Sequence, residues 1–550
     1  MPDPAEFSRS QAPFFPTTIA PPGRVSEVTF ISGVTSDATV AATSFGAWGA
    51  FEPYPSIPAQ YNPNYSNATK WGDPTLQLAG TPAVVTYQFD AASNWSDEEK
   101  GAWLAALTLW SAEVAITFTP TAGPTPDLTF FKQPLPGSPY ATAGTYQSFP
   151  DGVPSVIGSN VESVPGAGAF ITLDIYNDIT NPKGDTQPLG DTFADSNDFY
   201  FSLIHELGHA IGLGHGGPYN QGDIEPFDAA VRQFGPYDMA LWAMMSYVTP
   251  SMTNATFYAD YPVTGTNWGS GGIQPITPMM LDILAAQRLY GPATSGPLAG
   301  DNHIFGFNSN IAGPIKPYFD FTQNTQPVIP IWGLGVHNTL DLSGWSTPSI
   351  INLEPGSFSS GNGFTNNIGI AFNTVIEKAI GGGGNDTING NAYDNILVGG
   401  PGNDLITGGP GADRFVLGAP SQGVDTYFDF AYYQGDRIAL DHVGFGLSGT
   451  GGLAAAGVNF VYAFAPPSLG YNGPPPTGPT IIEYGSDVYW DADGAGASPA
   501  ALLAHVFGQG TPAPPVTRSA PNDVMLVDPA TGVLESFKVA QLTQYDFVIV

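Results

Sequence analysis

The stretch "FSLIHELGHAIGLGH" at residues 201–215 concentrates histidines in a chain that has few of them. Three of the seven histidines, His205, His209 and His215, lie here within eleven residues. Because His205 and His209 are four apart, a helix places both imidazoles on one face, where their ring nitrogens can reach one metal ion. Gly212 can end that helix and turn the chain back, so that His215 supplies a third nitrogen from the following loop. Three protein ligands and an open position for water are typical of catalytic zinc.

Glu206 follows His205 directly and is offset from it around the helix. Its carboxylate can hydrogen-bond a water on the zinc and accept its proton, since zinc lowers the pKa of that water to about 7. The whole pattern is HExxHxxGxxH, a metzincin signature that also predicts a methionine-containing turn downstream. Met245 in "AMMSY" fits that turn, and we expect it to form an apolar floor beneath the zinc ligands. Tyr247 follows two residues later, and its phenol could approach the metal or the developing oxyanion.

Three helices are predicted around this cluster. Residues 199–213 form the first, with an apolar face that must be buried. Residues 96–118 open with a capping box, Ser96 and Glu99, continue with apolar residues at helical spacing, and end in a short β-type run. The third helix, 279–291, is stopped by a glycine and a proline. After residue 292 helical patterns nearly vanish, which predicts a domain boundary and an all-β continuation.

A nine-residue period runs through residues 381–416. The units "GGGGNDTIN", "GNAYDNILV", "GGPGNDLIT" and "GGPGADRFV" match the GGxGxDxUx repeat of a calcium-binding parallel β-roll. Glycines permit tight turns that point carbonyls at an ion, and the sixth position adds a side-chain oxygen. The candidate calcium ligands at that position are Asp386, Asn395, Asp404 and Asp413. The unit at 390–398 is degenerate, with Asn391, Tyr393 and Asn395 in place of glycine, glycine and aspartate, so an ion there should be weaker or absent.

Composition restricts the kind of partner. Asp and Glu number 48 against 14 Lys and Arg, for a net charge of -34. Such a charge argues against nucleic acid or an anionic membrane surface as a partner and suits divalent cations, although an acidic or salty habitat explains it equally well. The chain has no cysteine, so disulfides and thiolate sites are excluded. No apolar run is long enough to predict a membrane span.

Taken together, these motifs resemble the serralysin family of secreted bacterial metzincin endopeptidases. The likeness is strongest in "HELGHAIGLGH" with "MMSY", in "MMLDILAAQRLYG", and from "TLDLSGW" through the nonapeptides. It implies an α+β metzincin zinc-protease domain followed by an all-β domain with a parallel β-roll or β-sandwich that binds calcium. It also implies zinc on the three histidines, Glu206 as general base, and Tyr247 as a displaceable fifth ligand. Gly333, Val336 and Asn338 stand where relatives have an Asp- and Gly-rich turn, which argues against an outer calcium site there.

The resemblance extends to export. "YDFVIV" at the C-terminus is similar to the acidic-then-apolar signal that a type I ABC exporter reads, so we expect a secreted, extracellular monomer that folds on binding calcium. The expected division is a flexible arm or propeptide (1–25), the protease domain (26–292), the β-roll region (293–420) and a C-terminal β region ending in the signal (421–550). Protein or peptide substrates are expected. The alternative is a calcium-binding surface or adhesive protein whose metzincin-like domain is not catalytic.

Overall fold

The structure is a computed structural model that divides into two compact units. Unit 1 holds the residues up to Phe305 together with Ser309–Gly335 and Phe364–Thr374, and unit 2 holds Gly306–Asn308, Val336–Gly363 and Val375–Val550. The described residues are 28, 31–32, 71, 79–133 except 125, 197–214, 216, 237–246, 266–268, 273–448, 450–463, 477–494, 499–508 and 542–550, and the strand backbones at 141–148, 154–156, 169–174, 524–527 and 534–539. The predicted arm at 1–25 lies outside them, as do His215 and Tyr247.

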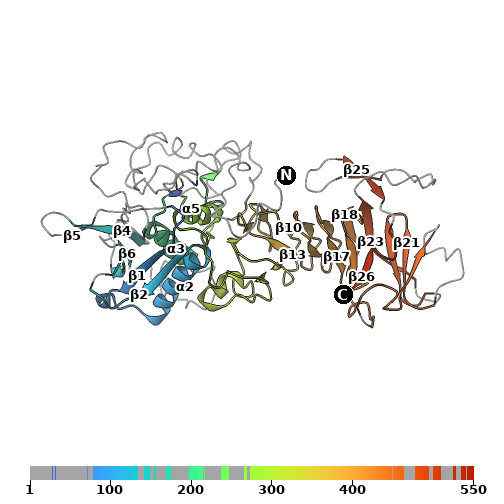
Figure 1. Cartoon of the computed structure of the whole chain (residues 1–550), viewed down its shortest axis with the longest axis horizontal. Coiled ribbons are helices and arrows are strands. Elements are labelled where there is room, and N and C mark those ends of the chain that lie inside the picture. Colours follow the sequence, from blue (N-terminus) through green and yellow to red (C-terminus); the bar gives the residue numbers. More distant parts are fainter. Residues whose placement is uncertain are drawn as a thin grey trace. The chain divides into compact units, whose positions relative to one another are not determined.

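A six-stranded sheet forms one part of unit 1 (Figure 1). Its order is β2-β1-β3-β6-β4-β5, and the pairs of β1 with β2 and β3 and of β3 with β6 are parallel, whereas β4 is antiparallel to β5 and β6. The strands are β1 (Ala83–Phe89), β2 (Ile116–Pro120), β3 (Leu128–Gln133), β4 (Ala141–Ser148), β5 (Pro154–Val156) and β6 (Ala169–Asp174). Buried and more exposed residues alternate along most of β1, as expected for a strand with one face on a core.

The three predicted helices of unit 1 are present as α2 (Asp97–Glu113), α3 (Asn197–Ala210) and α5 (Met280–Tyr290). The capping box of α2 is confirmed, because the Glu99 amide donates to Ser96 Oγ at 3.1 Å and the Ser96 amide donates to Glu99 Oε2 at 2.8 Å. Every residue of α5 is buried, so this helix lies wholly inside unit 1. The short elements are η3 (Ala91–Ser93), η8 (Gly313–Ile315), α6 (Lys316–Phe319), β8 (Ile329–Ile331) and β12 (Ile368–Ile370), and β8 pairs with β12 in parallel.

Unit 2 is all-β, and its first half is a roll of short parallel strands that alternate between two sheets (Figure 1). One sheet has the order β26-β19-β17-β15-β13-β9-β7, and the other runs β10-β14-β16-β18-β23-β22-β21-β20 with β25 beside β23 and β24 beside β25. The first sheet contains β7 (Ile304–Gly306), β9 (Asn338–Asp341), β13 (Ile376–Ile380), β15 (Ile396–Val398), β17 (Arg414–Leu417), β19 (Arg437–Leu440) and β26 (Phe547–Ile549). The second contains β10 (Ile350–Asn352), β14 (Thr387–Asn389), β16 (Leu405–Thr407), β18 (Asp425–Phe430), β20 (Asn459–Tyr462), β21 (Thr480–Tyr484), β22 (Asp487–Asp491), β23 (Ala501–Gly508), β24 (Val524–Val527) and β25 (Leu534–Val539). Strand β11 (Phe358–Ser359) also belongs to unit 2.

The nonapeptide period explains the roll. Each unit of nine residues gives one turn and one three- or four-residue strand, so successive strands fall in alternate sheets and pair in parallel with the strand two units away. The large apolar residue of each unit is fully buried between the sheets, as the sequence predicts: Ile388, Leu397, Ile406 and Phe415. The last strand, β26, pairs in parallel with β19 and therefore closes one edge of the same sheet.

No helix in the described part of the chain is long and apolar enough to cross a membrane.

Candidate metal centre and calcium-binding turns

Helix α3 brings His205 and His209 together inside unit 1. Their Nε2 atoms lie 3.1 Å apart, and each residue is only 6% exposed. The opposite face of the helix is apolar and also buried, with side chains that are at most 1% exposed: Leu203, Ile204, Leu207 and Ala210. Trp110 of α2 donates from its indole to the Ile204 carbonyl at 3.2 Å, which ties the two helices together.

The hydrogen bonds of the two imidazoles decide their tautomers. His205 Nδ1 lies 3.1 Å from the Met244 carbonyl oxygen, and His209 Nδ1 lies 3.0 Å from the Leu213 carbonyl oxygen. A carbonyl oxygen can only accept, so each Nδ1 carries a hydrogen. Burial lowers the pKa of His205 to about 4 and that of His209 to about 3, the latter with a contribution from the neighbouring His205 ring. Both rings are therefore neutral at pH 7, and their Nε2 lone pairs face each other.

Two Nε2 atoms at this distance, each on a ring whose Nδ1 is hydrogen-bonded to a carbonyl oxygen, are suited to share a cation. Carbonyl acceptors on Nδ1 are also the usual outer partners of metal-binding histidines, because they fix the tautomer and the ring orientation. The donor set therefore fits zinc. Among the described residues no three His, Asp or Glu side chains group together as a metal site, since the third candidate ligand, His215, lies outside them.

The end of α3 is built to redirect the chain toward His215. Gly212 has φ +107°, its amide donates to the His209 carbonyl at 2.9 Å, and the Leu213 amide donates to the Gly208 carbonyl at 2.8 Å. These two bonds and the positive φ form a Schellman motif, for which glycine carries no steric penalty. The residues on either side of His215 are also tied, because the Gly214 amide donates to the Ile31 carbonyl and the Gly216 amide to the Met245 carbonyl, at 2.9 and 3.1 Å.

Met245 lies in a fully buried turn against α3, and Asp282 of α5 holds that turn. Asp282 Oδ2 accepts from the amides of Met244 at 2.6 Å and Met279 at 2.8 Å, and Oδ1 accepts from the Met245 amide at 3.4 Å. The carboxylate thereby fixes the peptide whose carbonyl orients His205. Glu206 is half-buried on α3.

Sequence reasoning missed Asp282 and the two residues that close the end of α3. The Tyr290 hydroxyl donates to the Ile211 carbonyl at 2.5 Å and accepts from the Trp71 amide at 3.0 Å, while the Trp71 indole donates to the Ala210 carbonyl at 2.7 Å. An acidic residue inside the apolar run "MMLDILAA" is a signal that could have found Asp282. Nothing local marks Trp71 or Tyr290, because their partners lie 139 and 79 residues away.

The four candidate calcium residues of the roll occupy two columns of stacked turns in unit 2. All four are at most 1% exposed: Asp386, Asn395, Asp404 and Asp413. Within a column each turn bonds to the next, since the Asp386 amide donates to Asp404 Oδ1 at 2.8 Å and the Asn395 amide donates to Asp413 Oδ1 at 2.8 Å. This stacking leaves Oδ2 of Asp404 and of Asp413 for another partner, whereas both oxygens of Asp386 already accept backbone amides.

The remaining oxygens fit a bound cation at two of the turns. Asp404 Oδ2 and Asp413 Oδ2 are buried and have no hydrogen-bond partner among the described residues. Burial raises the pKa of Asp404 to about 7 against the lowering effect of the Asp386 amide, with the Asp386 charge also raising it. Burial likewise raises the pKa of Asp413 to about 7 against the Asn395 amide, with the charges of Asp436 and Asp429 also raising it. Buried carboxylates that have one unpaired oxygen and lie near other carboxylates are costly in a metal-free protein, and a divalent cation removes that cost.

The chain is similar to known metallopeptidases. Residues 298–446 match the family model described as Peptidase M10 serralysin C terminal. "Metallopeptidase AprA" of Pseudomonas marginalis is 32% identical over 58% of this chain and 60% of its own length, and "Serralysin" of Proteus mirabilis is 30% identical over 58% of this chain and 62% of its own. "Serralysin C" of Dickeya chrysanthemi is 38% identical over 34% of this chain and 35% of its own length. The matched part thus spans less than two thirds of each of these relatives.

Among solved structures, the high choriolytic enzyme 1 of Oryzias latipes, a hatching-enzyme zinc protease, covers 41% of this chain and 96% of its own at 15% identity, with a TM-score of 0.22. That TM-score is too low to establish a common fold. The family model and the curated relatives agree with each other and with the parallel β-sheets of unit 2. Residues 298–446 are therefore similar to the C-terminal part of the serralysin M10 peptidases, and the chain is similar to serralysin metallopeptidases over 58% of its length.

Proposed function

We propose that this protein is a secreted zinc endopeptidase that hydrolyses peptide bonds in protein substrates. The observation that carries the proposal is the pair of buried imidazoles of His205 and His209, whose Nε2 atoms lie 3.1 Å apart. His215 would complete the ligand set, since the residues on both sides of it are anchored to the same part of unit 1. The metallopeptidase names of the relatives support the same chemistry.

Zinc, when bound, acts as a Lewis acid that polarises the scissile carbonyl and lowers the pKa of water. The histidines orient that ion, and the Met244 and Leu213 carbonyls keep the two described imidazoles in the tautomer that presents Nε2. Glu206 takes the proton of the attacking water and passes it to the leaving amine. Tyr247 donates a hydrogen bond to the oxyanion that develops on the scissile carbonyl. Met245 and the neighbouring apolar side chains exclude water from the inner side of the histidines.

The proposal includes calcium in the roll. Asp404 and Asp413 would hold calcium through their buried second oxygens together with backbone carbonyls of the glycine turns, and Asp386 would contribute in the same column as Asp404. Calcium binding would then stabilise the stacked turns, because the ion offsets the repulsion between carboxylates that the turns hold close together. In keeping with the resemblance, we further propose export through a type I ABC exporter, with folding driven by extracellular calcium, and action as a monomer.

The test is hydrolysis of casein by the full chain, refolded in calcium with stoichiometric zinc. We expect Glu206→Gln to retain zinc and to lose turnover by roughly 10²–10⁴-fold, the usual contribution of a general base. Glu98→Gln on the exposed side of α2 is the matched control and should cleave like wild type. The same assay on protein without residues 1–25 removes any effect of a latent arm.

The alternative, a calcium-binding surface protein with a non-catalytic domain, makes the opposite prediction. If wild type and both variants bind zinc but none cleaves casein, with or without residues 1–25, the catalytic proposal is wrong. If Glu206→Gln cleaves as well as wild type, the assignment of Glu206 as general base is wrong.

A further inference from the structure

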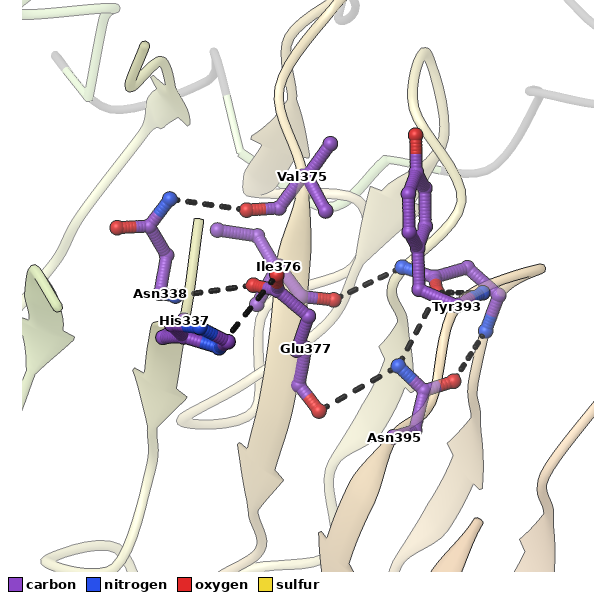
Figure 2. Close-up of polar contacts among 8 residues, drawn as sticks. His337, Asn338, Val375, Ile376, Glu377, Tyr393 and Asn395 are labelled. Atoms are coloured by element: carbon purple, nitrogen blue, oxygen red, sulfur yellow. Dashed lines mark hydrogen bonds and ion pairs between the residues drawn. The ribbon is translucent and has the colours of Figure 1, made fainter. Parts of the chain in front are cut away.

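Three asparagines meet the carbonyls of one segment near the start of the roll. Asn338 Nδ2 donates to the Val375 carbonyl at 2.9 Å, Asn391 Nδ2 to the Ile376 carbonyl at 2.8 Å, and Asn395 Nδ2 to the Glu377 carbonyl at 3.4 Å. Figure 2 shows the Asn338 and Asn395 side-chain amides bonded to Val375 and Glu377, on either side of Ile376. All three asparagines are at most 1% exposed. We call Asn338, Asn391 and Asn395 the asparagine clamp.

The side-chain amides of Asn391 and Asn395 make further hydrogen bonds that fix their orientation. Asn391 Nδ2 also donates to the Leu353 carbonyl at 3.1 Å, and Asn391 Oδ1 accepts from the Tyr393 amide at 3.0 Å and from Asn395 Nδ2 at 3.1 Å. Asn395 Oδ1 accepts from the Asn391 amide at 2.8 Å. These partners fix which atom of each amide is nitrogen, because carbonyls can only accept and peptide N–H groups can only donate.

The aspartate turns use the same positions differently. In the turn at 381–386, Asp386 Oδ2 accepts from the Gly382 amide at 2.6 Å and Oδ1 accepts from the Ser349 amide at 2.6 Å, so both branches of the side chain are acceptors. In the turn at 390–395, Asn395 Oδ1 accepts from the Asn391 amide of the same turn. The second branch of the side chain is an NH2 group, which donates to the Glu377 carbonyl of the preceding turn. A donor therefore stands where the aspartate turns present a second oxygen.

This exchange changes what the turn can bind. Calcium is held by oxygen ligands, both carboxylate and carbonyl. In the clamp the three carbonyls are already hydrogen-bonded, position 395 supplies an amide instead of a carboxylate, and the nearby Glu377 carboxylate already accepts from the Asn338 backbone amide at 3.0 Å. The amides are neutral and satisfied, so this turn also lacks the costly buried oxygens that Asp404 Oδ2 and Asp413 Oδ2 present in the next turns.

We propose that the turn at 390–395 takes no calcium ion and that the asparagine clamp cross-links it to Val375–Glu377 in place of one. The inference rests on the proposed binding of calcium by the aspartate turns and deepens it. Side-chain amides then close this turn of the roll without metal, and calcium is needed only for the aspartate turns. The turn at 390–395, held by the asparagine clamp, is then already ordered without calcium, and the calcium-dependent turns can stack on it.

The test restores the repeat in the full chain. Asn391→Gly/Tyr393→Gly/Asn395→Asp gives this turn the residues that the turn at 399–404 has at the same positions, and Asn395→Asp alone is the milder variant. Calcium per chain is measured by equilibrium dialysis against calcium chloride followed by elemental analysis. The expected result is one additional ion for the triple variant. Asn403→Asp adds the same charge at an exposed position of a neighbouring turn and should add none.

Thermal melts in EGTA give a second readout that does not need calcium binding. The triple variant and Asn395→Asp should both melt at a lower temperature than wild type in EGTA, because the clamp is broken. Calcium should raise their melting temperatures more than it raises that of wild type. An unchanged calcium count in a triple variant that folds, while wild type binds calcium, would overturn the inference, as would melting in EGTA at the wild-type temperature. A wild type that binds no calcium would instead overturn the proposed role of calcium, and the EGTA melts would still decide whether the clamp stabilises the metal-free roll.

Discussion

Gly208 of α3 lies directly against Met245, so that a Cβ atom at Gly208 would be 2.7 Å from the methionine Sδ. It would also be 3.4 Å from Trp110 Cζ2. The methionine of the turn therefore fits under the histidine-bearing helix only because this position has no side chain. Gly208 belongs to the fourteen-residue helix that carries His205 and His209, and a displaced methionine would disturb the peptide that orients His205.

Gly208→Ala should destabilise unit 1 and weaken zinc binding. Overpacking of a buried contact costs roughly 1–3 kcal/mol, which exceeds the ~1 kcal/mol that alanine gains over glycine inside a helix. Gly101→Ala in α2 is the matched control, because nothing lies within 4 Å of its Cβ and the substitution should stabilise the protein. Chemical denaturation and chelator competition for zinc measure the two effects.

A double-mutant cycle tests whether the loss of stability in Gly208→Ala comes from the contact with Met245. In the Met245→Ala background the space is free, so Gly208→Ala should lose its destabilising effect, with a coupling of roughly 1–3 kcal/mol. Equal effects of Gly208→Ala in both backgrounds would show that Met245 is not the obstacle.

Asp282 should make the stability of unit 1 depend on pH. Burial raises the pKa of Asp282 to about 7, against the lowering effect of the backbone amides of Met279, Met244 and Met245. A carboxyl whose pKa is higher in the folded state favours folding while it is protonated. Its contribution is therefore complete below about pH 4, falls as the pH rises through about 7, and is absent above that.

Asp282→Asn removes that titration. Urea unfolding followed by tryptophan fluorescence from pH 5 to 8 should show wild type losing stability relative to the variant, by at most roughly 1.4 kcal/mol per pH unit. Glu113, whose pKa is raised by burial and by Asp282, is present in both proteins, so only its coupling to Asp282 can differ between them. Parallel curves for the two proteins would mean that Asp282 is ionised throughout this range.

Tyr290→Phe should loosen the end of α3. The substitution leaves the Ile211 carbonyl and the Trp71 amide without their hydroxyl partner, at a cost of roughly 1–3 kcal/mol. Because this end directs the chain toward His215, zinc affinity should fall together with stability. Tyr432→Phe removes a hydroxyl from an exposed side chain and should change neither quantity. A Tyr290→Phe protein that binds zinc with wild-type affinity would show that the cap is structural only.

The sequence predicted the features that depend on short spacing. The HExxH spacing placed His205 and His209 on one helix face, the Ser96–Glu99 pair began α2, and the nine-residue period gave the parallel strands of the roll. In each case the residues that interact are within a helical turn or two repeats of each other, so local periodicity contains the information. The roles of His215 and Tyr247, the four-part division of the chain and the calcium assignment stay predictions.

What the sequence did not predict depends on contacts between distant segments. Asp282 reaches the Met244 amide across 38 residues, and Trp71 reaches Ala210 across 139. No periodic pattern encodes such pairs, because tertiary packing brings them together. The sequence predicts a weaker or absent calcium site at the degenerate repeat, whereas the amide network there follows only from the positions of Val375, Ile376 and Glu377.

Residues near the N-terminus of the described chain support the loop that carries His215, and this sets where the arm can be removed. Ile31 is fully buried, Val28 is 2% exposed, and the Ile31 carbonyl accepts from the Gly214 amide at 2.9 Å. Deletion of residues 1–25 should leave zinc affinity unchanged. Deletion of residues 1–33 leaves the Gly214 amide without an acceptor and should weaken zinc binding roughly tenfold or more, since an unpaired buried donor costs about 1–3 kcal/mol.

Ile31→Ala separates the two contributions, because it keeps the carbonyl and removes only the buried side chain. It should lower stability by roughly 2–5 kcal/mol while zinc affinity in the folded protein stays close to wild type. The same reasoning predicts that an active processed form begins before Val28, which N-terminal sequencing of the secreted protein would show. An active form that begins after Ser32 would contradict it, because the loop next to His215 would then hold its position without the Ile31 carbonyl.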